Sequence, residues 1–341
     1  MNNKKVLLTG ITGFLGSHTA IQLLNKGYEV IGTLRSMDRA KEIKEVIKKK
    51  TPNIDKLSFA EADLLDKDVW YDLVSEVQDV LHIASPFPRE LPKNEDDLII
   101  PAKSGTLHIL KAASMHGLRR VVLTSSSGAI IYGKDKSNRK GIFDENNWTD
   151  VSNINDSTPY FRSKTIAEQA AWDFIRNDTS GLELTTVCPG AILGPILEKD
   201  FGTSANIVIK AMDGSSPAIP KIGFDMVDVR SVADLHIRAL ETPEAAGERF
   251  VGSAGYMTFQ EVANILRENY PNKKVPKFTL PDFAVRLFSN IDKTIKPILI
   301  DLGTERKVNN NKAVKLLDWK PIPVKDAIIA CAESAIKLSL V

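Results

Sequence analysis

Tyr160 and Lys164 form a pair whose residue types and spacing could move a proton. On a helix, positions four apart lie on one face, so the phenol and the ammonium would be neighbours. A free tyrosine has a pKa of about 10, and a nearby ammonium lowers that value by stabilising the phenolate. Tyr160 could then give a proton to a carbonyl oxygen or remove one from an alcohol.

A cluster of three serines precedes this pair along the chain. Ser125, Ser126 and Ser127 follow the apolar run RRVVLT, which has the composition of a strand. A hydroxyl at the carboxyl end of a strand can hydrogen-bond a substrate oxygen and hold it near the tyrosine. Because Tyr-x-x-x-Lys also occurs on ordinary helix surfaces, the serine cluster is what favours a catalytic interpretation.

Three evenly spaced glycines, Gly10, Gly13 and Gly16, lie between the apolar run KKVLL and a helical pattern. Gly10 permits a tight turn, Gly13 lets the backbone approach a pyrophosphate, and Gly16 lets the helix pack on the strand. The helix N-terminus offers unpaired N–H groups to the anion, so the loop predicts a dinucleotide site. Thr9 and Thr12 fit an ordinary turn as well as side-chain hydrogen bonds that shape the loop. The other loop residues expected to contact the dinucleotide are Thr12, Phe14 and Leu15.

The end of the second apolar run indicates which dinucleotide fits. An acidic residue there would hydrogen-bond the ribose 2′-OH of NAD. This chain reads GTLRSMDR instead, with Arg35 at that place and Arg39 one helical turn further on. Two guanidinium groups could bind a 2′-phosphate through charge-assisted hydrogen bonds, which indicates NADP(H). The alternative is a pair of solvated surface arginines.

The elements that must position these residues alternate regularly. Short apolar runs and amphipathic stretches follow one another through the first half of the chain, which is the pattern of βαβ units. Parallel strands need long crossovers, so the pattern predicts an α/β fold with a doubly wound parallel (Rossmann) sheet. We expect this domain to comprise residues 1–188 and about 225–252, and a smaller mixed substrate lobe to comprise 189–224 and 253–341. Ser231 would cap the helix that returns to the main domain.

Ligands of such sheets bind beyond the carboxyl ends of the strands. The third strand closes at Asp63 and Leu64, and the fourth closes at Ala84 and Ser85. We therefore expect these four residues beside the adenine and the ribose. Asp63 could instead cap the helix that begins near Asp66.

The bulk composition excludes several classes of protein. With 45 Lys+Arg against 43 Asp+Glu, no global field recruits nucleic acid or an anionic membrane. The N-terminus lacks an apolar signal segment, and no apolar run is long enough to span a membrane. The two cysteines, Cys188 and Cys331, cannot build a disulfide framework, and Cys188 lies in an apolar run typical of a buried thiol. We expect a cytoplasmic protein.

Taken together, TGITGFLG, TSSSG, YFRSK and PGAILGP resemble the extended branch of the short-chain dehydrogenase/reductase superfamily. The arginine in GTLRS, the HIASPF segment, the WTD after a DE pair, and MVDVRSVADLHIRALE are most similar to the dihydroflavonol reductase group. That group includes microbial methylglyoxal and aldehyde reductases. The resemblance implies that Ser126 is the catalytic serine, but Ser127 adds a hydroxyl where the group usually has a small apolar residue, so both stay candidates.

The resemblance also implies further contacts with the cofactor and the substrate. Pro189, Gly190 and Ile192 would border the nicotinamide, and Ser204 would lie near the phosphates. The resemblance places His82 and Phe87 near the substrate, but for His82 we favour a buried position in the core.

The expected activity is NADPH-dependent reduction of an aldehyde or ketone. Hydride would pass to the carbonyl carbon, with Ser126 orienting the oxygen, Tyr160 as the acid, and Lys164 lowering the tyrosine's pKa and holding the ribose. The partner would be a small carbonyl or alcohol, without metal, nucleic acid or membrane, and the chain would be a monomer or a homodimer. Two alternatives are a nucleotide-sugar epimerase or dehydratase of the same fold, and a non-catalytic dinucleotide sensor. Arg35 and Arg39 favour the reductase over the first, and the retained tyrosine and lysine favour it over the second.

Overall fold

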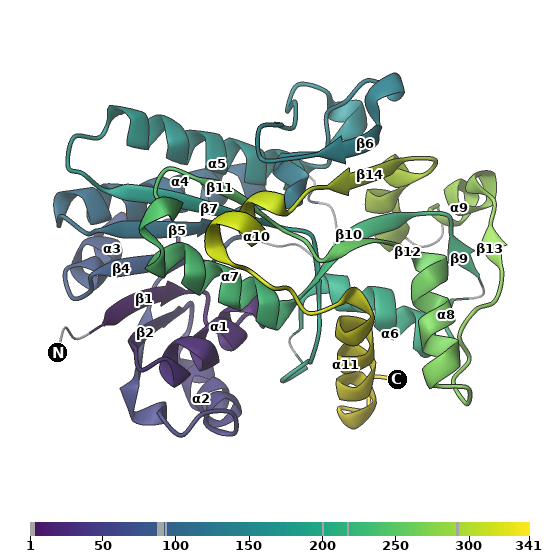
Figure 1. The fold of residues 1–341 in the computed structure, drawn as a ribbon, viewed down its shortest axis with the longest axis horizontal. Helices are drawn as coiled ribbons and strands as arrows, with labels where there is room; N and C mark the ends of the chain where they lie inside the picture. The colour runs from purple at the N-terminus through teal and green to yellow at the C-terminus, as the bar shows by residue number, and fades with distance from the viewer. Residues whose placement is uncertain (1–3, 87–91, 93, 200, 217, 291–292) are drawn as a thin grey trace.

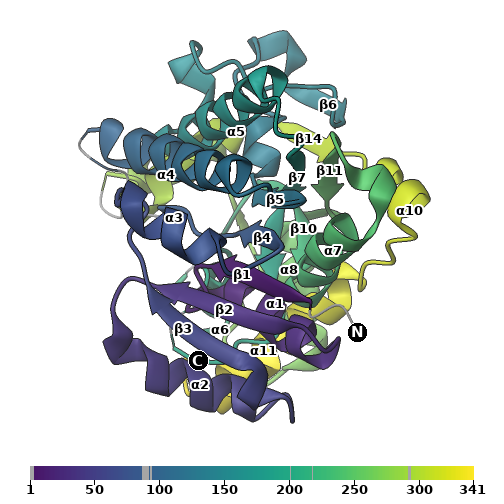
Figure 2. The same ribbon diagram turned by 90° about the vertical axis from the view of Figure 1, so that its left-hand side faces the viewer.

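A parallel sheet of seven strands runs through the larger part of the molecule (Figures 1 and 2). Its strands span Lys5–Thr9 (β1), Glu29–Leu34 (β2), Leu57–Glu61 (β3), Asp79–His82 (β4), Arg120–Thr124 (β5), Glu183–Pro189 (β7) and Arg249–Gly252 (β11). They lie in the order β11-β7-β5-β4-β1-β2-β3. The computed structural model describes residues 4–86, 92, 94–199, 201–216, 218–290 and 293–341. The predicted doubly wound parallel sheet is confirmed.

Helices cover both faces of this sheet, because alternate residues of each strand point to opposite sides. On β1, Val6 and Leu8 pack into one core, and Leu7 packs into the other. The first core is covered by Phe14–Asn25 (α1), Ala40–Lys48 (α2) and Val229–Glu241 (α7). The second is covered by Lys67–Val74 (α3), Asp96–Met115 (α4) and Pro159–Asn177 (α5). With helices on both faces, the edge at the carboxyl ends of the strands is where side chains can meet a ligand.

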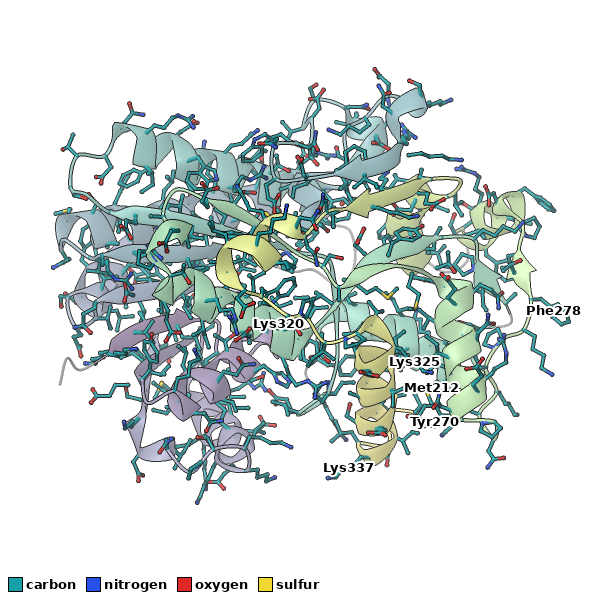
Figure 3. The ribbon with its side chains drawn as sticks, viewed as in Figure 1. Met212, Tyr270, Phe278, Lys320, Lys325 and Lys337 are labelled. Atoms are coloured by element: carbon teal, nitrogen blue, oxygen red, sulfur yellow. The ribbon has the colours of Figure 1, made fainter. Side chains whose placement is uncertain are left out.

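A second, smaller part of the chain is built on a mixed sheet. Its three strands are Ala191–Leu193 (β8), Gly223–Asp228 (β10) and Gly255–Thr258 (β12), with β10 parallel to β8 and antiparallel to β12. The helices of this part are Asn206–Met212 (α6), Phe259–Asn269 (α8), Asp282–Phe288 (α9) and Val324–Lys337 (α11). Met212 of α6 is buried between them, and Tyr270, just after α8, donates a hydrogen bond to Ile329 O of α11 at 3.4 Å (Figure 3). Helices α6, α8 and α11 therefore share a core of their own with the mixed sheet, and Val285 of α9 lies in a smaller cluster.

Two pairs of short strands join distant parts of the sequence. Lys140–Phe143 (β6) pairs in parallel with Glu305–Val308 (β14), and Ile219–Pro220 (β9) pairs with Thr279–Leu280 (β13). The first pair ties the segment after β5 to the C-terminal part of the chain.

The expected division into two domains stays a prediction, and the described contacts favour two adjustments to it. Strand β10 belongs to the mixed sheet, whereas α7 and β11 belong to the main domain. The short helix Asn311–Leu317 (α10) and Trp319 also return to the main core, where Ala313 and Trp319 are fully buried. The boundary is therefore crossed several times.

The predicted cap of α7 is wrong. Asp228 begins the helix, and its Oδ1 accepts a hydrogen bond from the backbone N of Arg230 at 2.8 Å. Ser231 lies inside the first turn, buried, and its hydroxyl accepts from the backbone N of Ile322 at 2.9 Å. A carboxylate is also a good N-cap, so Asp228 caps the helix in place of Ser231. Ser231 instead joins α7 to the distant segment at Ile322.

None of the helices in the described residues combines the length and the apolar character that crossing a membrane requires.

Candidate active site

The glycine loop connects the end of β1 to the start of α1. Gly10 has a φ of +72°, and a Cβ placed there would lie 3.0 Å from Ala84 Cα. At Gly16 a Cβ would lie 2.1 Å from Gly10 O, so the loop passes directly against the first turn of the helix. Within the described chain, no side chain caps α1 and its first turn has no acidic residue. The N–H groups at this helix start are thus arranged to receive an anion such as a pyrophosphate.

Thr9 ties the glycine loop to the end of β4. Its hydroxyl oxygen accepts from the backbone N of Ile83 and of Ala84, each at 3.0 Å, and is hydrogen-bonded to His82 Nδ1 at 2.8 Å. Thr9 is therefore more than an ordinary turn residue, because its side-chain hydrogen bonds shape the loop. Thr12 and Phe14 are partly buried, whereas Leu15 packs into the core, so any contact of Leu15 with a ligand would be made by its backbone.

The two arginines after β2 differ in their surroundings. Arg35 is exposed. Arg39 Nη2 donates to Glu198 Oε2 at 2.7 Å, and its Nε lies 3.5 Å from Glu42 Oε2. One of the two guanidinium groups expected at a 2′-phosphate therefore contacts a carboxylate that follows β8.

Asp63 and Leu64 follow β3 as expected. Asp63 Oδ1 accepts from the backbone N of Leu65 at 2.8 Å, while Asp66 caps α3 by accepting from Asp68 N at 3.1 Å. The alternative that Asp63 caps this helix is therefore wrong. Leu64 lies against α4, where a Cβ on Gly105 would be 2.8 Å from the Leu64 Cβ.

The three serines after β5 have three different environments. Ser125 Oγ donates to Glu168 Oε2 at 2.6 Å. Ser126 is 8% exposed, accepts from Gly128 N at 3.0 Å, and is hydrogen-bonded to the Tyr160 side chain. Ser127 is partly buried at the start of a short 3-10 turn. The contact with Tyr160 supports Ser126 over Ser127.

Helix α5 presents Tyr160 and Lys164 to this strand end. Thr158 caps the helix by accepting from Phe161 N at 3.3 Å, and Pro159 occupies the first helical position, where its missing N–H costs nothing. Lys164 is 7% exposed, and its Nζ donates to Thr124 O at 2.9 Å. The tyrosine hydroxyl and the lysine ammonium are therefore held at the carboxyl end of β5.

Burial, and not Lys164 as expected, has the largest effect on the pKa of Tyr160. Burial raises the pKa of Tyr160, and the hydrogen bond with Ser126 opposes that rise without cancelling it. Burial likewise lowers the pKa of Lys164 to about 8, against the attraction of nearby anionic groups. Desolvation disfavours the charged form of each side chain, so the phenolate is destabilised and the ammonium is weakened. Tyr160 is therefore protonated near neutral pH and ready to donate.

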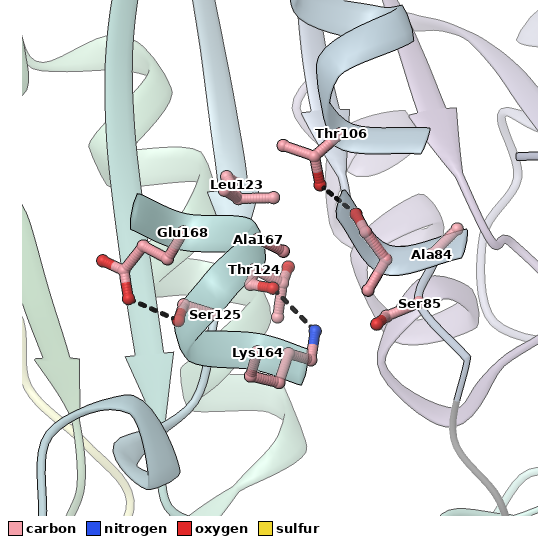
Figure 4. A pocket seen from close by; sticks show the side chains of 10 residues that line it. Ala84, Ser85, Thr106, Leu123, Thr124, Ser125, Lys164, Ala167 and Glu168 are labelled. Atoms are coloured by element: carbon pink, nitrogen blue, oxygen red, sulfur yellow. Dashed lines mark hydrogen bonds between the residues drawn. The ribbon is translucent and has the colours of Figure 1, made fainter. Parts of the chain in front are cut away.

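A small cavity beside Lys164 brings the dinucleotide strand ends and the catalytic helix together (Figure 4). Ala84 and Ser85 line it from the end of β4, Thr124 and Ser125 from the end of β5, and Lys164 from α5. Two residues expected beside the adenine and the ribose thus share this cavity with Lys164, whereas Ser126 and Tyr160 do not line it.

The segment after β7 crosses from the main sheet to the mixed sheet. Pro189 ends β7, and Gly190 N donates to Gly252 O at 3.0 Å. A Cβ on Gly190 would lie 2.3 Å from Asp225 O, and Ile192 of β8 packs against the main core. These positions form the junction between the two parts of the molecule.

Ser204 lies in the 3-10 turn Thr203–Ala205, close to the glycine loop. A Cβ on the preceding Gly202 would lie 3.3 Å from the Phe14 side chain, so this turn approaches the start of α1.

His82 is a core histidine: it is 2% exposed, and its pKa is lowered to about 3 by burial and by the charge of Lys164. Phe87 lies outside the described residues.

The sequence interpretation missed a buried group behind the serines. Glu168 accepts from Ser125 and from Arg249, and the Arg249 guanidinium lies 3.6 Å from the centre of the Trp148 ring. The WTD segment is part of this group through Trp148, and its Thr149 Oγ1 donates to Gly128 O at 2.8 Å. The spacing of Lys164 and Glu168, which puts both on one helix face, was the available signal.

Among the described residues, no cluster of histidine, cysteine, aspartate or glutamate has the arrangement of a metal site.

Known proteins resemble this chain over most of its length. The family described as the NAD dependent epimerase/dehydratase family matches residues 6–251. The ketoreductase azaE of Aspergillus niger is 35% identical over 301 residues, which cover 82% of this chain and 87% of that protein. Tetraketide alpha-pyrone reductase 1 of Arabidopsis thaliana is 34% identical over 276 residues, covering 80% and 83% of the two chains. The crystal structure of yeast methylglyoxal/isovaleraldehyde reductase Gre2 complexed with NADPH superposes with a TM-score of 0.80 at 30% identity, over 98% of this chain and 99% of that one.

Proposed function

The chain belongs to the NAD dependent epimerase/dehydratase family, and from that membership and the site above we propose that it is an NADPH-dependent reductase of aldehydes and ketones. One observation carries the proposal. The phenol of Tyr160 is hydrogen-bonded to Ser126 and accompanied by the Lys164 ammonium, at the sheet edge that also holds the glycine loop. The similar proteins named above are reductases, which supports the same chemistry here.

We propose Ser126, Tyr160 and Lys164 as the catalytic residues. Bound NADPH supplies the hydride that reduces the carbonyl carbon. Ser126 orients the carbonyl oxygen by a hydrogen bond, and Tyr160 gives that oxygen its proton. The raised pKa of Tyr160 keeps the proton in place until charge develops on the oxygen. The charged Lys164 then stabilises the phenolate that remains, and we propose that it also holds the ribose.

The residues present fit the cofactor. A pyrophosphate would be received by the backbone of the loop at Gly10, Gly13 and Gly16, which passes so close to the start of α1 that Gly16 has no room for a Cβ. We propose that Arg35 binds the 2′-phosphate and that Arg39 joins it by exchanging its contact with Glu198 for the phosphate. The remaining cofactor contacts that we propose are Thr12, Phe14, Leu15, Asp63, Leu64, Ala84, Ser85, Pro189, Gly190, Ile192 and Ser204.

Oxidation of NADPH by the purified protein tests this function directly. We expect absorbance of the reduced cofactor to fall in the presence of some members of a panel of aldehydes, ketones and flavonoid-like carbonyls, and to fall more slowly with NADH. Consumption with none of them would contradict the proposal. Conversion of a nucleotide sugar without net use of cofactor would instead support an epimerase.

We also propose that the protein works in the cytoplasm, as a monomer or a homodimer. Both cysteines are buried free thiols, which is compatible with a reducing compartment. Light scattering coupled to gel filtration would measure the mass of the particle in solution.

A further inference from the structure

Glu168 is a buried carboxylate behind the catalytic residues, and the proposed reaction gives it no role. It lies on α5 one turn after Lys164 and two turns after Tyr160, and it is 1% exposed. A carboxylate in such a place is costly unless it is paired and hydrogen-bonded. The hydrogen-bond partners of Glu168 therefore indicate which parts of the site this carboxylate fixes.

Donors from three neighbouring strands of the main sheet converge on this carboxylate. Ser125 Oγ, directly after β5, donates to Oε2 at 2.6 Å, and Thr186 Oγ1 of β7 donates to Oε1 at 2.7 Å. Arg249 of β11 binds both oxygens, with Nε to Oε1 at 2.7 Å and Nη2 to Oε2 at 3.2 Å. Figure 4 shows Glu168 bonded at Ser125 and Lys164 bonded at the adjacent Thr124. The carboxylate and the ammonium thus hold consecutive residues of one strand end.

Arg249 is itself held in place, so it cannot move with the carboxylate. Its guanidinium stacks over the Trp148 ring, and its Nη1 donates to Glu145 O at 2.5 Å and to Asn147 O at 3.0 Å. The result is a row of fixed charges, Lys164, Glu168 and Arg249, in a region of low dielectric where charges act strongly on one another.

The other titratable groups that face Lys164 are neutral near pH 7. Burial lowers the pKa of His82 on β4 to about 3 and that of His236 on α7 to about 4. Burial raises the pKa of Cys188 on β7 to about 12 and also raises the pKa of Tyr160 on the same helix. Each of these side chains therefore carries no charge when Lys164 titrates.

Of the charged groups in the described elements packed around it, Glu168 is the one that attracts Lys164. Its carboxylate raises the pKa of Lys164, and Arg249 is paired with that carboxylate. Because burial already brings the pKa of Lys164 to about 8, a modest change in these charges decides whether the ammonium is present at neutral pH.

We infer that Glu168 is a positioning residue that keeps Lys164 charged and fixes the strand end carrying Ser126. Its meaning for catalysis rests on the proposed function, but its effect on the charge of Lys164 does not require turnover. The ammonium is lost as the pH rises through the pKa of Lys164, so removal of the Glu168 charge moves that loss to lower pH.

The test is Glu168→Gln, which keeps the shape of the side chain and removes its charge. The titration midpoint of Lys164 is read by NMR in protein labelled with 13C-lysine, and the resonance is assigned by its disappearance in Lys164→Met. We expect the midpoint to fall by about one pH unit. Inside a protein, a unit charge one helical turn from a lysine shifts the pKa of that lysine by about this amount. The alkaline limb of kcat/KM should move to lower pH by the same amount.

Two further variants separate charge from structure. Thr186→Val removes another hydrogen bond to the same carboxylate without changing any charge, so we expect a lower melting temperature and an unmoved midpoint. Arg249→Met removes the cation that partly neutralises the Glu168 carboxylate, so the Lys164 midpoint should move to higher pH. A folded Glu168→Gln protein with the wild-type midpoint overturns the inference.

If Glu168→Gln does not fold, Arg249→Met decides, and a midpoint equal to that of the wild type overturns the inference. A wild-type protein that reduces no carbonyl would contradict the proposed function alone, because the NMR midpoint is measured without substrate.

Discussion

Two ends of the proposed cofactor site contrast in how the protein surrounds its charges. The catalytic wall, which comprises Ser126, Tyr160 and Lys164, is largely removed from water, and burial shifts the pKa values of its tyrosine and lysine. The phosphate rim, which comprises Arg35 and Arg39, has Arg35 exposed and Arg39 in contact with a carboxylate. A hydrogen bond or charge is worth more in the wall than in the rim, where water and salt screen it. Changes in the wall should therefore alter rates strongly, and changes in the rim should alter cofactor choice more gently.

Tyr160→Phe should have the largest effect, because it removes the proton donor, together with its hydrogen bond to Ser126, and keeps the aromatic ring. We expect kcat to fall by about 10²- to 10⁴-fold, the usual contribution of a positioned acid. NADPH affinity, measured by fluorescence titration, should stay nearly unchanged. A variant that retains a substantial rate would remove the tyrosine from the mechanism.

Ser126→Ala and Ser127→Ala are a matched pair within the wall. We expect Ser126→Ala to lower kcat/KM by about 10²-fold, since it deletes a preorganised donor to the reacting oxygen. Ser127→Ala should change kcat/KM only slightly, because Tyr160 is hydrogen-bonded to Ser126. Steady-state kinetics on both variants compares them, and the opposite ranking would transfer the role to Ser127.

Arg35→Ala tests the phosphate rim. Loss of a charge-assisted hydrogen bond to a 2′-phosphate should weaken NADPH binding by about 10- to 100-fold and leave NADH binding unchanged. The dissociation constants of both cofactors, measured at low and at high salt, test this, and the difference should narrow at high salt because the rim is exposed. Equal losses for the two cofactors would contradict an NADP(H) site at Arg35.

Glu198→Gln should have the smallest effect. It weakens the attraction of Arg39 toward Glu198 Oε2, so Arg39 can turn to a phosphate at lower cost. An ion pair at a partly exposed site is worth at most about 1 kcal/mol, so we expect NADPH to bind at most about fivefold more tightly. NADH affinity is the control. A weaker affinity for NADPH would mean that Glu198 supports the site rather than competing for its arginine.

The features of this protein that depend on local spacing could be predicted from the order of its residues. The parallel sheet follows from the alternation of apolar runs and helical stretches, and the helix expected to carry Tyr160 and Lys164 is α5. The glycine loop could be found because its glycines are evenly spaced between a strand pattern and a helix pattern, all within a few residues. The pair Tyr160 and Lys164 was visible for the same reason, since helical geometry alone puts them on one face.

Tertiary structure alone decided what surrounds those residues. Arg39 meets Glu198, Arg249 meets Glu168, and Ser231 meets Ile322, all from segments far apart along the chain. Even the direction of the Tyr160 pKa shift was decided this way, because burial outweighs the hydrogen bond with Ser126. Spacing along a helix or strand is a local property of the backbone, whereas desolvation and the choice of an ion-pair partner depend on everything packed around a side chain.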